Sequence, residues 1–144
     1  MRLLFKKSSK IIIIVLLLLS GLFLLTQTNK RYTGKGLWYG YKIETKQLEG
    51  KIYRLVVAEN PEQWTKGLMY VRKPVNEFDG MIFRFPKKQP QLFWNQNTFE
   101  NLTLYWISDG QILGKSELPS IERSKQIVTV ESPAPVDTVV EIIK

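Results

Sequence analysis

The sequence predicts an all-β sandwich or barrel with one short helix, preceded by a single transmembrane helix. Two observations lead to this fold class. An uncharged apolar run occupies Ile11–Leu25, and about eight short strand-like segments follow it, separated by Gly, Pro, Asn and Asp turns. A chain of 144 residues has room for one domain beside the helix, since domains usually contain about 100–150 residues. We therefore expect one compact, mostly β domain at residues 41–144.

The first element is a membrane anchor. Residues 1–10 carry four basic side chains and no acidic one, but Lys30, Arg31, Lys35 and Lys42 follow the run, so the count of basic residues is equal on its two sides. We expect residues 1–10 to form a basic tail in the cytoplasm because this N-terminal tail is very short. The apolar run that follows gives only about 22 Å of helix, so the anchor needs residues 11–28 to approach a hydrocarbon core of about 30 Å. With the tail inside, the rest of this single-pass protein lies outside the cytoplasm. The membrane is therefore an expected partner.

A cleaved signal peptide is the alternative to an anchor. Its cleavage site usually has small residues in an A-x-A-like pattern, but no alanine precedes Ala58. A lipoprotein signal requires a cysteine, and the chain has none. We therefore favour an uncleaved signal-anchor, with secretion after cleavage as the open alternative.

The composition excludes several classes of chemistry. Without Cys and His, the chain has no disulfide, thiolate nucleophile, zinc finger, imidazole metal site or Ser-His-Asp triad, so we expect no metal and no cofactor. The tail holds four of the 21 basic residues, which leaves 17 basic against 13 acidic residues. A nucleic-acid binder usually has a dense basic stripe, so we expect no nucleic acid as a partner.

The elements after the anchor follow from turn signals and periodicity. Residues 29–40 are polar and contain three glycines, which is typical of a tether. Alternating side chains predict a strand at Tyr41–Leu48. Glu49-Gly50 is a two-residue turn into a second strand at Ile52–Ala58.

A capped helix follows the second strand. Asn60 can cap it, Pro61 suits the first helical position, and Gln63 stands where a capping box needs it. Gly67 ends this short helix after Lys66.

Strand-like runs complete the chain, and Asp109-Gly110 predicts a tight hairpin between two of them. The runs are Met81–Phe85, Leu92–Gln96, Leu102–Ser108, Gln111–Glu117, Gln126–Glu131 and Val136–Ile143.

Three short motifs in a fixed order point to a known family. They are Gly67-Leu68-Met69, Gly80-Met81-Ile82-Phe83 and Trp94…Asn97-Thr98. Taken singly, each is a turn joined to a core strand. In this order, over about Ile52–Glu131, they resemble the prokaryotic family called domain of unknown function 192. The resemblance implies a jelly-roll-like β domain, often exported or membrane-anchored, with no established reaction, substrate or cofactor. We assign structural roles to the helix cap and to residues of the first two motifs: Asn60, Gly67, Leu68, Gly80, Met81 and Phe83.

The chain departs from the family pattern at several positions. Gln96 stands where the family usually has a basic residue, and Thr103 stands where it usually has Asp. The C-terminal end has Ser132-Pro133-Ala134-Pro135 and a β-branched strand in place of a small helical turn. If the Asp and the basic residue take part in chemistry elsewhere in the family, this chain has lost both.

The sequence favours binding over catalysis. The acidic pairs Glu59/Glu62 and Glu77/Asp79 flank a cap and a turn, so we assign no catalytic residue. A flat aromatic ring beside amides suits recognition of a glycan or a peptide backbone. The candidate binding residues are Trp94, Gln96, Asn97, Thr98, Met69 and Arg72. We expect them to bind an envelope glycan or protein. The alternatives are an accessory or scaffold protein of an envelope complex and a carboxylate-dependent hydrolase.

Overall fold

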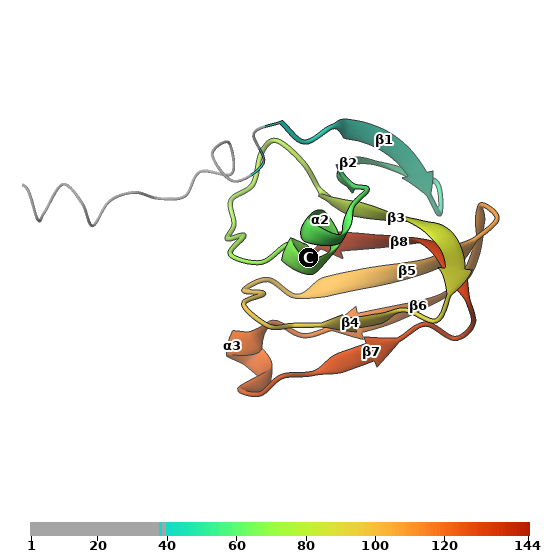
Figure 1. The fold of residues 1–144 in the computed structure, drawn as a ribbon. Coiled ribbons are helices and arrows are strands. Elements are labelled where there is room, and N and C mark those ends of the chain that lie inside the picture. The colour runs from blue at the N-terminus through green and yellow to red at the C-terminus, as the bar shows by residue number, and fades with distance from the viewer. Residues whose placement is uncertain (1–37, 39) are drawn as a thin grey trace, which may run out of the picture. The chain divides into compact units, whose positions relative to one another are not determined.

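A computed structural model describes Trp38 and residues 40–144 (Figure 1). These residues belong to one unit, Gly34–Lys144. The predicted tail at residues 1–10, the anchor at 11–28 and nearly all of the tether lie outside the described residues. Within the described part, no helix has the length and apolar character that a membrane crossing requires.

The fold is mostly β, with eight strands and two short helices in the described part of the chain. Six strands form one sheet in the order β1-β2-β3-β8-β5-β6 (Figure 1). Their bounds are β1 Ile43–Leu48, β2 Lys51–Ala58, β3 Gly80–Gln89, β5 Leu102–Ser108, β6 Gln111–Leu118 and β8 Val136–Ile143. A second sheet consists of β4 (Leu92–Trp94) and β7 (Thr129–Glu131).

The larger sheet is open, in contrast to the barrel closure that the sequence left possible. β1 and β6 form its two edges. β2 and β3 run parallel, with Leu55 opposite Gly80, whereas the other paired strands are antiparallel. Parallel neighbours need a crossover connection, and α2 (Pro61–Lys66) lies on this one. An open sheet with one β-α-β crossover is therefore what the chain builds from the predicted strands.

Both predicted two-residue hairpins are present. Leu48 pairs with Lys51 across Glu49-Gly50, and Ser108 pairs with Gln111 across Asp109-Gly110. All four turn residues have positive φ. Such backbone angles match the right-handed twist of the flanking strands, which explains why Glu-Gly and Asp-Gly occupy these turns.

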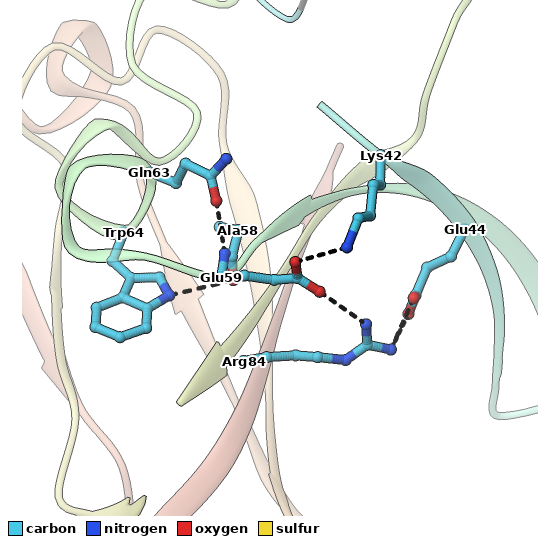
Figure 2. A network of polar contacts seen from close by, with 7 residues as sticks. All are labelled: Lys42, Glu44, Ala58, Glu59, Gln63, Trp64 and Arg84. Carbon is cyan, nitrogen blue, oxygen red and sulfur yellow. Dashed lines mark hydrogen bonds and ion pairs between the residues drawn. The ribbon is translucent and has the colours of Figure 1, made fainter. Parts of the chain in front are cut away.

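The predicted capping box holds α2. Asn60 Oδ1 accepts a hydrogen bond from the Gln63 backbone N–H at 3.0 Å, and Gln63 Oε1 accepts one from the Glu59 N–H at 2.7 Å. Gly67 has φ +46° and donates its N–H to the Gln63 carbonyl, which ends the helix. Trp64 Nε1 donates to the Ala58 carbonyl at 3.1 Å (Figure 2). The indole therefore ties the short helix to the end of β2.

An ion-pair network joins the strands beside the start of α2 (Figure 2). Arg84 contacts Glu44 at 2.7 Å and Glu59 at 3.8 Å, and Lys42 contacts Glu59 at 3.0 Å. These groups are partly exposed, so each pair contributes at most about 1 kcal/mol. Their effect is to hold β1, β3 and the end of β2 in register where the helix begins.

The larger sheet has a buried core on each face. One core contains Phe83, Leu104 and Trp106 and is covered by the α2 region and by Phe93. The other contains Leu55, Ile82 and Val140. On this second face the turn after β1 reaches β6, since Lys115 Nζ lies 2.8 Å from a Glu49 carboxylate oxygen. Tyr105 donates its hydroxyl to the same carboxylate at 3.2 Å. The sheet therefore curls until side chains bridge its two ends.

Several local elements differ from the sequence prediction: β3 continues to Gln89, beyond the expected end at Phe85, and β7 begins only at Thr129. The strand expected at Leu92–Gln96 ends at Trp94, because the chain turns through Asn97, which has φ +54°. The second helix, α3 (Ile121–Ser124), was not predicted. Ser120 caps it by accepting a hydrogen bond from the Arg123 N–H at 3.1 Å. Four residues are too few to show helical periodicity, which explains why the sequence pattern missed this element.

Gly80→Ala should lower the free energy of unfolding by more than the addition of one methyl group would suggest. A Cβ at this position would lie 1.9 Å from the Glu141 backbone oxygen, on the neighbouring strand β8. We expect a loss of at least about 3 kcal/mol in the free energy of unfolding. In the control Gly110→Ala, nothing lies within 4 Å and only the φ of +78° opposes a side chain. That variant should lose about 1–2 kcal/mol. Equal losses in chemical unfolding would contradict this account of β3–β8 packing.

Candidate functional site

A cavity of about 100 Å³ opens where α2 and the turn after it cross the sheet. Its walls come from α2, from β3, from the segment containing β4, and from β8. The lining residues are Trp64, Thr65, Lys66, Gly67, Leu68, Met69, Phe83, Phe85, Gln91, Leu92, Phe93, Trp94, Thr98 and Glu141. We call this cavity the Glu141 pocket.

Five of the fourteen lining residues are aromatic. The rings of Phe83 and Phe93 meet edge to face with centroids 4.9 Å apart, and Trp64 lies 5.2 Å from Phe85. Alternation along β3 puts Phe83 and Phe85 on the same face. The hydrogen bond from Trp64 to β2 fixes the indole above them. The pocket therefore combines a cluster of packed aromatic rings with polar side chains.

Glu141 supplies a carboxyl group to this enclosure. It lies on the central strand β8, paired with Met81 on one side and Leu104 on the other, and is 3% exposed. Its Oε2 has no hydrogen-bond partner among the residues that the structure describes. Burial raises the pKa of this carboxyl to about 8. Glu141 is therefore mostly protonated and uncharged at neutral pH.

Gly67 leaves the space above this carboxyl free. A Cβ on Gly67 would lie 3.9 Å from Glu141 Oε2 and 3.6 Å from the Phe83 ring. The residue that ends α2 thus also leaves room in the pocket.

Lys66 is the other ionisable residue that lines the pocket. Its Nζ lies 4.5 Å from the ring centroid of Trp38 and 5.3 Å from that of Tyr41. Burial lowers the pKa of Lys66, while the charge of Glu62 acts in the opposite direction. The ammonium group is therefore held by aromatic rings outside the pocket lining.

A second polar atom in the pocket is also unpaired. Gln91 Nε2 is buried and has no hydrogen-bond partner within the described part of the chain. The backbone of Gln91 is fixed, because its N–H donates to Ser132 Oγ and its carbonyl accepts from the Ser132 N–H. An unpaired buried polar group costs about 1–3 kcal/mol. Two such atoms in one pocket mark it as a site that a ligand can complete.

Three of the predicted binding residues line this pocket, and three lie outside its lining. Trp94, Thr98 and Met69 line it, and Trp94 is 46% exposed. Asn97 instead donates its side-chain N–H to the Tyr70 hydroxyl at 2.9 Å. Arg72 pairs with Glu122 at 2.8 Å and lies over the Phe99 ring. Gln96 is also absent from the pocket lining.

The neighbouring Asn95 has a structural role. It is fully buried and donates its side-chain N–H to the Pro119 carbonyl at 2.9 Å and to Ser124 Oγ at 2.8 Å. Its Oδ1 accepts from the Val128 N–H at 2.8 Å. This amide joins three segments of the chain, so not every amide of the motif is available to a ligand.

The acidic pairs and the departures from the family pattern lie away from the pocket lining. Glu59 belongs to the ion-pair network, and Asp79 accepts the Arg54 backbone N–H at 2.7 Å. Thr103 donates its hydroxyl to Glu117 at 3.1 Å. The replacements at Thr103 and Gln96 therefore leave the composition of the Glu141 pocket unchanged.

Sequence reasoning missed Glu141 and Gln91. Glu141 did leave a signal, because it is an acid with two apolar β-branched residues on each side, and alternation puts it on the face of Val139 and Ile143. No sequence signal pointed to Gln91, because a polar residue between two predicted strands is ordinary.

Comparison with known proteins bears out the family resemblance. The family described as "Uncharacterized ACR", domain of unknown function 192, matches residues 42–144. No curated protein matches the chain. A solved structure from Sinorhizobium meliloti, provisionally described as a transcription regulator, has 29% identity and a TM-score of 0.54, covering 72% of this chain and 79% of that one. A protein of unknown function from Novosphingobium aromaticivorans has 20% identity and a TM-score of 0.52, covering 72% and 82%.

Glu141 should make the stability fall as pH rises toward 8. The unfolded chain releases this proton near the ordinary pKa of 4.5, whereas the folded chain keeps it until about pH 8. Between these values the folded state holds one more proton, so the free energy of unfolding should fall by up to about 1.4 kcal/mol per pH unit. The pKa values of Glu49, Glu117 and Asp137 are lowered, so these groups change the free energy of unfolding at pH values below this window.

Urea unfolding between pH 5 and pH 8 measures this slope, and Glu141→Gln is the matched variant without the titrating group. The slope should be present in the parent chain and absent in the variant. Equal slopes in both chains would show that Glu141 titrates normally.

Proposed function

The chain belongs to the family of domain of unknown function 192, and from this premise we propose that it is a non-catalytic binding domain whose site is the Glu141 pocket. The observation that carries the proposal is the buried Glu141 Oε2, which has no hydrogen-bond partner among the described residues although Glu141 lines a cavity. The ligand is a component of the cell envelope that places an uncharged polar group in the pocket.

A purely structural role does not account for Glu141. A buried carboxyl normally stabilises a fold only when it is paired, and replacing such a group by an apolar residue of similar size is often neutral or stabilising. Here one carboxyl oxygen of Glu141 and Nε2 of Gln91, which lines the same pocket, have no hydrogen-bond partner within residues 40–144 and Trp38. A ligand that hydrogen-bonds to both atoms would offset the free energy lost by burying them without partners. The pocket therefore favours binding as its function.

The half-exposed aromatic ring at the mouth supports the same proposal. Trp94 is 46% exposed and Leu92 is 66% exposed, and both line the pocket. Single exposed apolar side chains are ordinary, but neighbouring ones beside a cavity commonly mark a binding surface. A ligand held in the pocket would cover them.

We also propose that the domain acts on the outer side of the membrane, held by the apolar segment at Ile11–Leu25. The absence of an A-x-A cleavage pattern supports retention as an anchor.

Protease added to intact cells should digest the folded domain and leave a membrane fragment that contains Ile11–Leu25. Recovery of a shortened soluble protein from the medium would instead show cleavage of a signal peptide.

The name of the Sinorhizobium relative suggests gene regulation, but the charges of this domain favour another role. Seven of the fourteen basic side chains in the described part of the chain form ion pairs with carboxylates: Lys42, Arg54, Arg72, Arg84, Lys88, Lys115 and Lys144. Phosphate binding would have to break such pairs, whereas a nucleic-acid interface usually offers unpaired basic groups.

A hydrolase is the second candidate, because a carboxyl with a pKa of about 8 can donate a proton at neutral pH. Hydrolysis by two carboxyl groups needs a second one near the first, and Glu141 is the one carboxyl group in the pocket lining. The two functions separate in one assay, since a hydrolase releases soluble products from envelope material and a binding domain does not.

Glu141→Leu should abolish binding without weakening the fold. Full-length chain in detergent should be retained on isolated envelope material from the cells that produce it, and the Leu variant should lose this retention at least tenfold. Its free energy of unfolding at pH 7 should be equal to or higher than that of the parent, because an unpaired polar group is removed.

Trp94→Ala should also lose retention, since the ring lines the mouth of the pocket. Asn97→Ala is the matched control, because Asn97 lies in the same motif but outside the pocket lining. Full retention of the Glu141→Leu variant, or equal losses in all three variants, would contradict the proposal.

A further inference from the structure

We propose that the ligand group in the Glu141 pocket is an exocyclic hydroxyl of a sugar, whose ring lies against Trp94 at the mouth. This inference rests on the proposed function and names the class of ligand, a glycan with an accessible hydroxymethyl group. It follows from the two unpaired atoms, from the size of the cavity and from the exposed ring beside it.

The two unpaired atoms define the chemistry of the group that enters. Gln91 Nε2 carries N–H donors, so the ligand must offer an acceptor. Glu141 Oε2 is also unpaired, and an uncharged carboxyl both donates and accepts hydrogen bonds. A hydroxyl group has one O–H donor and two lone pairs, so it matches the hydrogen-bonding chemistry of both side chains.

Charged groups fit the same two atoms less well. An ammonium group has no acceptor and leaves Gln91 Nε2 unpaired. A carboxylate would have to leave water for a pocket walled by Phe83, Phe85 and Phe93, where a buried charge without an opposite partner is expensive. The Lys66 ammonium lies over the rings of Trp38 and Tyr41, which do not line the pocket. An uncharged group is therefore the better occupant.

The volume limits how much of the ligand enters. The cavity measures about 100 Å³, whereas an apolar cavity of about 150 Å³ holds one benzene molecule. A hydroxymethyl group fits this space, and a complete sugar ring does not. The ring must then remain at the mouth, where Trp94 is 46% exposed. Sugar rings have apolar C–H faces that pack on indole, and Trp94 is the exposed ring among the aromatic residues that line the pocket.

A peptide is the competing ligand. A main-chain peptide group carries both a donor and an acceptor, but its flanking residues prevent it from entering a cavity of this size. The primary amide of an Asn or Gln side chain is small enough, so it is the alternative that the experiment must separate from a sugar hydroxyl.

The experiment uses full-length chain in micelles of a detergent that contains no sugar, and detects binding by saturation-transfer NMR. The probes are methyl glucoside and methyl galactoside, their 6-deoxy counterparts, and acetamide. The hexosides should bind, and removal of the exocyclic hydroxyl should weaken binding at least tenfold. Gln91→Leu and Glu141→Leu should each cause a similar loss for the hexosides, with little further loss for the 6-deoxy sugars. Asn97→Ala should bind as the parent does.

Equal binding of hexosides and 6-deoxy sugars, or binding of acetamide alone, would overturn the sugar assignment. The envelope assay then separates this failure from failure of the proposed function. Retention that survives periodate oxidation of the envelope glycans but is lost after protease treatment would leave the binding domain in place with a protein ligand. Retention that responds to neither Glu141→Leu nor Trp94→Ala would reject both proposals.

Discussion

The parallel pairing of β2 with β3 is the constraint on which the site depends. A parallel pair requires the chain to cross the sheet before the second strand begins, and α2 lies on this crossover. Gln63 and Trp64 hold the helix to the end of β2 (Figure 2). Asn60 caps the helix, and Gly67 ends it beside Glu141 of β8. The crossover segment therefore covers the central strands and encloses Glu141.

The covering of β8 by the crossover segment explains the pKa and the unpaired oxygen of Glu141. Side chains packed between the helix and the sheet exclude water from Glu141, which raises its pKa and leaves an uncharged carboxyl with one unpaired oxygen. The larger core around Phe83, Leu104 and Trp106 supplies the stability that allows such a group to persist. The unpaired carboxyl oxygen thus lowers the stability of the fold locally, at a place where a bound ligand could pair with it, and such local costs are common at binding sites.

Local signals predicted the elements that depend on local chemistry. The Asn60–Gln63 capping box, the glycine after α2 and the Asp109-Gly110 hairpin are all present, because a few adjacent residues determine each of them. The strand order was beyond sequence reasoning, since β8 inserts between β3 and β5 through contacts distant in sequence. The short helix α3 is held by Ser120 and by the buried side chain of Asn95, and neither contact has a periodic pattern.

The candidate site was predicted in part for the same reason. Trp94, Thr98 and Met69 were identified from their motifs, whereas Asn97 and Arg72 are engaged with Tyr70 and Glu122. Glu141 escaped notice because an acid in a strand usually faces water, and only the helix that covers β8 reverses that expectation. The covering helix comes from the opposite half of the domain sequence, which no pattern around position 141 reveals.

The most direct test of this account is a carbon-13 NMR titration of the Glu141 side-chain carboxyl, assigned by its loss in Glu141→Gln. The account predicts the chemical shift of a protonated carboxyl through pH 7 and a midpoint near pH 8. A midpoint near the ordinary value of 4.5 would show that water or an opposite charge reaches the group, and would contradict an enclosed, uncharged Glu141 pocket.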